Sequence, residues 1–182
     1  MMSIRFIFTL FLLVLAIQIN GQEERAFLPT IEIGAGLGGQ FYLNYLESNP
    51  MYWVRTGINY PSGEKSSFSL LAGVEGLRNE TFVPLIVRYT YGQTNKFYTH
   101  FGYAFGLWSD VDLIREYDFS GGAAIGAGYQ RSILMRPKLE LLLAAGYEFR
   151  TAHLEFETSQ PGSDVNSDLE YHFFSIGIKA ML

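Results

Sequence analysis

Apolar and polar side chains alternate along short segments of this 182-residue chain. The clearest segment is Pro137–Arg150. Its odd-numbered positions from Leu139 to Phe149 are apolar or aromatic, whereas its even-numbered positions are mostly charged or small. Successive side chains of a β-strand point to opposite faces, so this segment predicts a strand with one apolar face and one charged face.

Seven further segments show the same alternation, which predicts eight strands in total. The eight predicted strands are Thr30–Tyr45, Tyr52–Tyr60, Ser67–Leu77, Phe82–Tyr91, Lys96–Leu107, Asp118–Gln130, Pro137–Arg150 and Leu169–Leu182. The fold class is therefore all-β, and we expect an eight-stranded antiparallel up-and-down transmembrane β-barrel with apolar faces toward lipid and polar faces toward the lumen. The alternative is a soluble periplasmic barrel that binds a lipophilic ligand inside. Its apolar faces would have to point inward, where eight strands leave little room.

The lengths of the connections agree with a membrane barrel. Short turns are expected at Pro61–Ser66, Gly92–Asn95 and Arg131–Arg136, and long loops at Trp108–Tyr117 and Thr151–Asp168. Short periplasmic turns and longer outer loops are typical of this architecture. Near Ala152 the alternation shifts, which indicates either a β-bulge or a hairpin that continues above the membrane.

The N-terminus predicts export. Residues Met1–Gly21 contain a positive charge at Arg5 followed by an apolar run, Phe6–Ile19. This run is shorter than the roughly 20 residues that a membrane-spanning helix needs, so we interpret it as a cleavable signal peptide. The expected organisation is a signal peptide over 1–21 and a single barrel domain over 22–182, located in the outer membrane of a Gram-negative cell envelope.

Composition narrows the function classes. The absence of cysteine excludes disulfides, cysteine–zinc sites and thiol catalysis, and the net charge of −5 argues against a nucleic-acid partner. Aromatic residues make up 16% of the chain, and many fall near predicted strand ends, where they would form girdles at the two membrane interfaces. The expected girdle residues are Tyr42, Tyr45, Tyr52 and Trp53 at one end and Tyr60, Tyr89, Tyr91, Phe97 and Tyr129 at the other.

Charged residues interrupt the small residues on the predicted lumen side. They are Glu32, Arg55, Glu75, Arg88, Lys138, Glu140, Glu148, Arg150 and Lys179. Because the interior of an eight-stranded barrel is only wide enough for side chains to fill it, we expect these charges to form a packed network of ion pairs. A narrow channel for small solutes is the alternative interpretation.

Histidines and serines near the predicted outer loops raise two further alternatives. His153 and His172, placed as cross-strand neighbours near Glu155, Glu157 and Glu170, would form a weak cation site. A lipid-modifying enzyme would need one of these histidines beside a serine and an acid. The serine candidates are Ser159, Ser163 and Ser167, and the acid candidates are Glu155 and Asp168. No spacing matches a recognised motif, so we expect no enzyme, no metal site and no cofactor.

Four segments resemble the outer-membrane protein β-barrel domain family of small porin-like and OmpA-like eight-stranded barrels. They are Thr81–Tyr91 (TFVPLIVRYTY), Phe97–Gly106 (FYTHFGYAFG), Gly122–Gln130 (GAAIGAGYQ) and Phe174–Leu182 (FSIGIKAML). One departure is the C-terminal Leu182, where such chains often end in phenylalanine. The resemblance implies contact with outer-membrane lipid and with the barrel-assembly machinery, and it implies no reaction. We therefore expect a monomeric barrel with a structural or surface-interaction role through its outer loops, toward a partner the sequence does not identify.

Overall fold

The computed structural model describes residues 27–42, 45–77, 80–109, 116–136, 139–157 and 165–182. The predicted signal peptide lies outside these ranges. The strands are β1 (Leu28–Tyr42), β2 (Tyr45–Pro61), β3 (Ser66–Leu77), β4 (Glu80–Gly92), β5 (Asn95–Ser109), β6 (Glu116–Ser120), β7 (Gly122–Arg136), β8 (Leu139–Glu157) and β9 (Val165–Met181). Among the described residues, no helix has the length and apolarity needed to cross a membrane.

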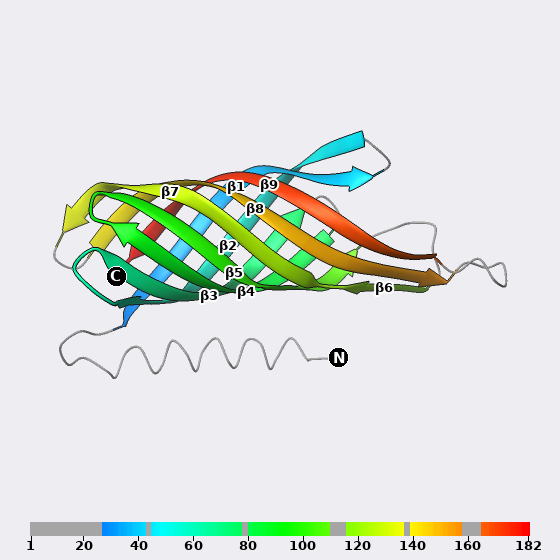
Figure 1. The fold of residues 1–182 in the computed structure, drawn as a ribbon, viewed down its shortest axis with the longest axis horizontal. Coiled ribbons are helices and arrows are strands. Elements are labelled where there is room, and N and C mark those ends of the chain that lie inside the picture. The colour runs from blue at the N-terminus through cyan, green and yellow to red at the C-terminus, as the bar shows by residue number, and fades with distance from the viewer. Residues whose placement is uncertain (1–26, 43–44, 78–79, 110–115, 137–138, 158–164) are drawn as a thin grey trace.

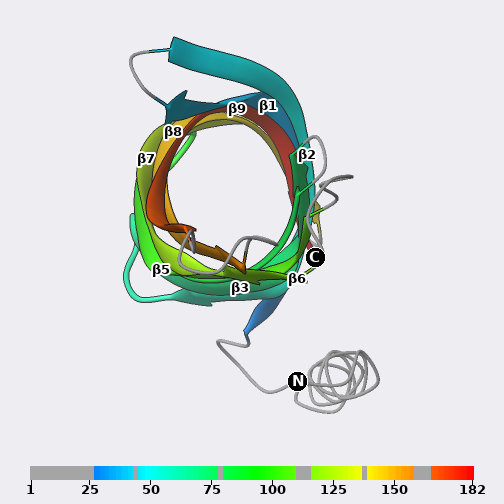
Figure 2. The ribbon, with the colours of Figure 1, turned by 90° about the vertical axis from the view of Figure 1, so that its right-hand side faces the viewer.

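The strands form a closed antiparallel barrel, which confirms the predicted fold class (Figures 1 and 2). Consecutive strands pair from β1 to β5 and from β7 to β9, and β5 pairs with β7. β9 pairs with β1 from Gln40↔Tyr171 to Thr30↔Met181 to close the wall. β6 and β7 both pair with β8, one above the other, and together occupy one position in the wall. The wall therefore has eight positions, and the predicted strand Asp118–Gln130 is divided at Gly121.

The predicted facing of the strands is also found. Large apolar side chains on the outer surface are exposed on every described long strand, for example Ile33, Val54, Phe101 and Ile176. The polar and charged side chains between them are buried in the lumen, which is the reverse of a soluble barrel. This arrangement suits a surface in contact with lipid, because the bilayer core favours apolar side chains and every backbone group of a closed barrel is paired.

One predicted turn is wrong. Residues Arg131–Arg136 belong to β7, and the β7–β8 connection lies at 137–138, outside the described residues. The ladder shifts between Ser132↔Leu142 and Leu134↔Leu141, so Ile133 is the extra residue of a β-bulge. The bulge interrupts the alternation, which explains why the pattern suggested that the strand had already ended.

Strands extend into both predicted long loops. β8 and β9 stay paired without a register shift from Glu140↔Met181 to Phe156↔Val165. The β8–β9 ladder therefore has no bulge near Ala152, and the alternative, a hairpin that continues, is the one found. β1 and β2 form a second extended hairpin, whose ladder reaches Tyr42↔Tyr45, and it projects at the same end of the barrel (Figure 1).

Candidate functional site

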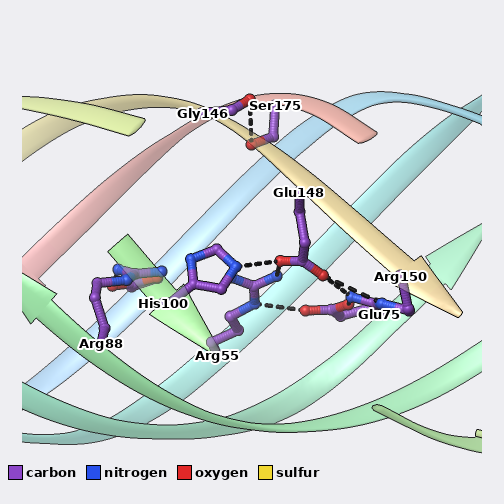
Figure 3. A network of polar contacts seen from close by, with 9 residues as sticks. Arg55, Glu75, Arg88, His100, Gly146, Glu148, Arg150 and Ser175 are labelled. Carbon is purple, nitrogen blue, oxygen red and sulfur yellow. Dashed lines mark hydrogen bonds and ion pairs between the residues drawn. The ribbon is translucent and has the colours of Figure 1, made fainter. Parts of the chain in front are cut away.

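The centre of the lumen holds a cluster of two arginines and two glutamates from three strands (Figure 3). Arg55 Nε lies 2.5 Å from Glu75 Oε1, and its Nη2 lies 3.1 Å from Glu148 Oε2. Arg150 Nη2 lies 2.5 Å from Glu75 Oε2 and also pairs with Glu148. All four side chains are buried, and each carboxylate bridges both guanidinium groups. The cluster is thus balanced in charge, which a buried group of ions requires to be stable.

Toward the end of the barrel with the short turns lies a second group of three charges. Glu32 on β1 forms an ion pair with Arg88 on β4, and Lys179 Nζ on β9 lies 3.5 Å from Glu32 Oε1. These three side chains are also buried. One carboxylate therefore faces two cations in this section of the lumen.

Of the two remaining predicted lumen charges, Glu140 lies at the turn end of the barrel. Glu140 is bound by Lys96 Nζ at 2.7 and 2.8 Å and accepts a hydrogen bond from Ser132. This pair is only partly buried. Lys138 lies outside the described residues. The structure thus brings seven of the nine predicted charges into the two buried groups and places Glu140 in a separate pair.

Two aromatic residues join the charges, and the sequence pattern did not assign them to the network. His100 Nε2 lies 2.9 Å from Glu148 Oε2, and its ring stacks on Tyr98. The Arg88 guanidinium lies 4.5 Å from the centre of the Tyr98 ring. These large side chains fit because glycines lie opposite them, since a Cβ on Gly126 would overlap His100 and a Cβ on Gly146 would overlap the Tyr98 hydroxyl. The glycine-rich lumen face therefore makes room for specific rings.

The outer end of the lumen is apolar, which corrects the expectation of a lumen that is polar throughout. The apolar cluster consists of Met51, Trp53, Leu77, Phe82, Ala104, Ala152, Leu169, Tyr171 and Phe173. Trp53, predicted as a girdle residue, points into the barrel because it lies between the outward residues Tyr52 and Val54. The Arg150 guanidinium joins the two regions, at 4.8 Å from the Phe82 ring centre and 4.9 Å from that of Phe173.

The outer end also contains a polar contact that the sequence did not suggest. The Tyr171 hydroxyl donates to Glu80 Oε1 at 2.9 Å. Phe82 and Tyr171 meet edge to face beneath it, with ring centres 5.7 Å apart. Aromatic side chains from β4 and β9 thus pack across the interior above the ionic cluster, and the barrel is filled from its centre to this end.

Little free space remains beside the charges. A small cavity of about 20 Å3 is lined by Glu32, Arg55, Arg88, Tyr98 and Lys179 among others. This volume holds about one or two water molecules. A wider cavity of about 170 Å3 lies at the turn end, between the β2–β3 turn and Lys96. No continuous water-filled path is formed by these two cavities.

The outer histidines are placed differently from the prediction. His153 pairs with Asp168 across the β8–β9 hairpin, with Nδ1 2.9 Å from Oδ1, whereas His172 lies beside Phe149 and 2.6 Å from the Tyr147 hydroxyl. The two histidines are therefore not cross-strand neighbours. The described residues contain no group of three or more histidines, aspartates or glutamates arranged to hold a metal. Ser159 and Ser163 lie outside the described residues.

The aromatic girdle at the turn end is present. Phe97 and Tyr129 meet with ring centres 5.4 Å apart, and Phe68 and Tyr89 with ring centres 5.1 Å apart. Tyr60, another predicted girdle residue, packs on Phe27. At the other end Tyr52 is exposed on the outer surface. Rings at this level suit the headgroup region of a membrane.

No protein-family model and no curated protein matches this chain. Among solved structures, Neisserial surface protein A is similar with a TM-score of 0.54 and 11% identity, over 85% of this chain and 97% of that one. The outer membrane protein AlkL, solved in DMPC bilayers, is similar with a TM-score of 0.50 and 12% identity, over 89% and 92% of the two chains. The outer membrane protein OprG from Pseudomonas aeruginosa has a TM-score of 0.49 and 11% identity, over 85% and 96%. Together with the closed wall and its apolar outer surface, the first two likenesses establish that this chain has the fold of an eight-stranded outer-membrane β-barrel.

Proposed function

We propose that this protein is a non-enzymatic integral barrel of the Gram-negative outer membrane, with a closed lumen, that acts through its extended outer end. The observation that carries the proposal is the filled interior. Arg55, Glu75, Glu148 and Arg150 cross-link the lumen at its centre, and an apolar cluster lies above them. A barrel filled in this way resists passage of solutes, so its outer hairpins are the part available for contacts.

The height of the β8–β9 hairpin supports this role. Outward positions of β9 are apolar from Ala180 to Phe174 and become polar from His172 to Asp168, which marks the upper edge of the apolar band. Beyond Arg150, β8 continues for seven residues, to Glu157. At about 3.3 Å per residue and a tilt of about 45°, this extension rises about 16 Å along the barrel axis. The hairpin therefore presents a paired, ordered surface above the membrane.

Conductance tests the closed lumen against the channel alternative. We expect the purified barrel in a planar lipid bilayer to give no regular single-channel steps, because side chains leave space for only one or two waters beside Arg88. A matched variant, Arg150→Ala with Phe82→Ala and Phe173→Ala, removes a central guanidinium and the two rings above it and should admit ions. Regular steps from the unchanged protein, of the size seen for this triple variant, would contradict the proposal.

Cysteine labelling tests the location and the orientation, since the natural chain has no cysteine. Asp168→Cys places a thiol on the outer hairpin, where the Asp168 side chain is 88% exposed. Glu64→Cys is the matched control in the exposed β2–β3 turn. A membrane-impermeant maleimide should label the first variant in intact cells and the second only after the outer membrane is permeabilised. Labelling in the opposite order, or of both variants in a soluble periplasmic fraction, would refute the proposed arrangement.

A further inference from the structure

The section of the lumen around Glu32 has one positive charge more than its carboxylates balance. Arg55 and Arg150 are matched by Glu75 and Glu148, and Lys96 is matched by Glu140. Arg88 and Lys179, in contrast, share the single carboxylate of Glu32. Both cations are 2% exposed. Because a buried charge without a counter-charge is strongly destabilising, this excess indicates a compensating anion.

Unused hydrogen-bond donors gather at the same place. Among the described protein atoms, Arg88 Nε and Gln130 Nε2 are buried and have no hydrogen-bond partner. Gln130 as a whole is 1% exposed. Lys179 Nζ has three protons to donate and a single carboxylate contact, at 3.5 Å. Buried donors are nearly always satisfied in folded proteins, so a group of three points to an acceptor between them.

A cavity of suitable size lies among these donors. The cavity of about 20 Å3 is lined by Arg88, Gln130 and Lys179, together with Glu32, Tyr98 and Ser175. It has room for one small ion, and the single excess positive charge favours a monovalent anion. Gln130 and Lys179 also line the wider cavity at the turn end, which gives a short route from solvent.

We propose that this cavity binds one monovalent inorganic anion of the size of chloride. The ion accepts hydrogen bonds from Arg88, Gln130 and Lys179 and balances the charge that Glu32 leaves uncompensated. A divalent cation is disfavoured there by the two nearby positive charges. This inference does not depend on what the outer hairpins contact, and it assigns to the lumen a ligand that the fold alone does not imply.

The first test is the thermal unfolding of the barrel in detergent micelles, in sodium chloride and in sodium gluconate at equal ionic strength. Gluconate is too large for the cavity. We expect the unfolding temperature to rise with chloride concentration and to saturate, and not to rise with gluconate. An unchanged unfolding temperature would mean that the cavity holds water only and would overturn the proposal.

Variants locate the anion. Lys179→Met should abolish the chloride dependence of the unfolding temperature. Gln130→Met should raise the half-saturating chloride concentration at least tenfold. Glu32→Gln should lower the half-saturating chloride concentration, because the excess positive charge in the cavity rises. Lys65→Met, the same chemical change in the exposed β2–β3 turn, is the control and should leave the dependence unchanged. Heat-modifiable migration on a gel checks that each variant has folded.

A direct measurement keeps the proposal testable even when a variant does not fold. Crystals of the unchanged protein grown in sodium bromide should show an anomalous scattering peak between Arg88 and Lys179. A chloride dependence that survives in Lys179→Met, or a bromide peak only at the protein surface, would show that the anion binds elsewhere and would overturn the assignment.

Discussion

Replacing Arg150 with methionine tests the idea that the lumen is held together by its balanced charges. Arg150 is fully buried, pairs with Glu75 and Glu148, and lies between the rings of Phe82 and Phe173. Methionine fills much of the same space without the charge. The variant leaves two buried carboxylates with one guanidinium, that of Arg55.

The expected loss follows from these contacts. Breaking a buried ion pair by removing one partner costs about 3–5 kcal/mol. Arg55 still bridges both carboxylates, which lowers the cost, whereas the lost cation–π contacts add about 1 kcal/mol. We therefore expect Arg150→Met to lower the free energy of unfolding by about 4 kcal/mol. Adding Glu148→Gln restores the balance of one cation and one carboxylate, so the double variant should recover about 1–2 kcal/mol.

The assay is urea unfolding of the barrel in lipid vesicles, followed by tryptophan emission, because Trp53 lies in the apolar cluster next to this network. Lys96→Met is the matched control. It breaks the partly buried pair with Glu140 at the turn end and should cost about 1 kcal/mol. If Arg150→Met costs no more than Lys96→Met, or if Glu148→Gln adds to the loss, the charges are not coupled as argued.

Three further predictions test the outer surface, a turn and the fit of a ring. Ile178→Lys, at the middle of the apolar band on β9, should cost about 2–4 kcal/mol in urea unfolding, and Phe97→Lys in the girdle about 1 kcal/mol or less; equal costs would contradict the assigned membrane position. Gly92→Ala should cost about 1–3 kcal/mol, because Gly92 has a φ of +129° and a Cβ there would overlap the Asn95 carbonyl; refolding at the rate and stability of the unchanged protein would argue against this turn geometry. Gly146→Ala should cost about 1–3 kcal/mol by forcing the Tyr98 hydroxyl aside, and Tyr98→Phe should rescue it, with the same urea assay as the check.

Much of the wall could be predicted from the sequence because a strand in a barrel alternates strictly between two environments. The outward residues on β5 and β9 were assigned correctly for this reason. The pattern failed at the outer end of the lumen, where inward positions are apolar instead of polar. Trp53 and Phe173 are apolar yet point inward, into the apolar cluster at the outer end of the lumen. An apolar residue at an inward position cannot be told from a phase shift by sequence alone.

The composition of the lumen network was predictable, but its grouping was not. Charges on alternate positions identified Arg55, Glu75 and Arg150 as inward. Which cation meets which carboxylate depends on the tilt and stagger of strands far apart in sequence, as for Arg55 and Glu148. The role of His100 could not be predicted for the same reason. Its ring meets Gly126 and Glu148 only once β5, β7 and β8 are aligned.

The pairing of β1 with β9 has a consequence for how the barrel forms. Most wall contacts join strands that are close neighbours in the chain, but this seam joins the two ends of the domain, and Glu32 meets Lys179 across it. Lys179 therefore reaches the Glu32–Arg88 pair only when the last strand has paired with β1. A half-built barrel has two open edges and an incomplete set of lumen charges, so closing the seam and completing the interior are one cooperative event. Long-range pairings of this kind form late and slowly, and the rate of insertion should depend on the last strand to dock.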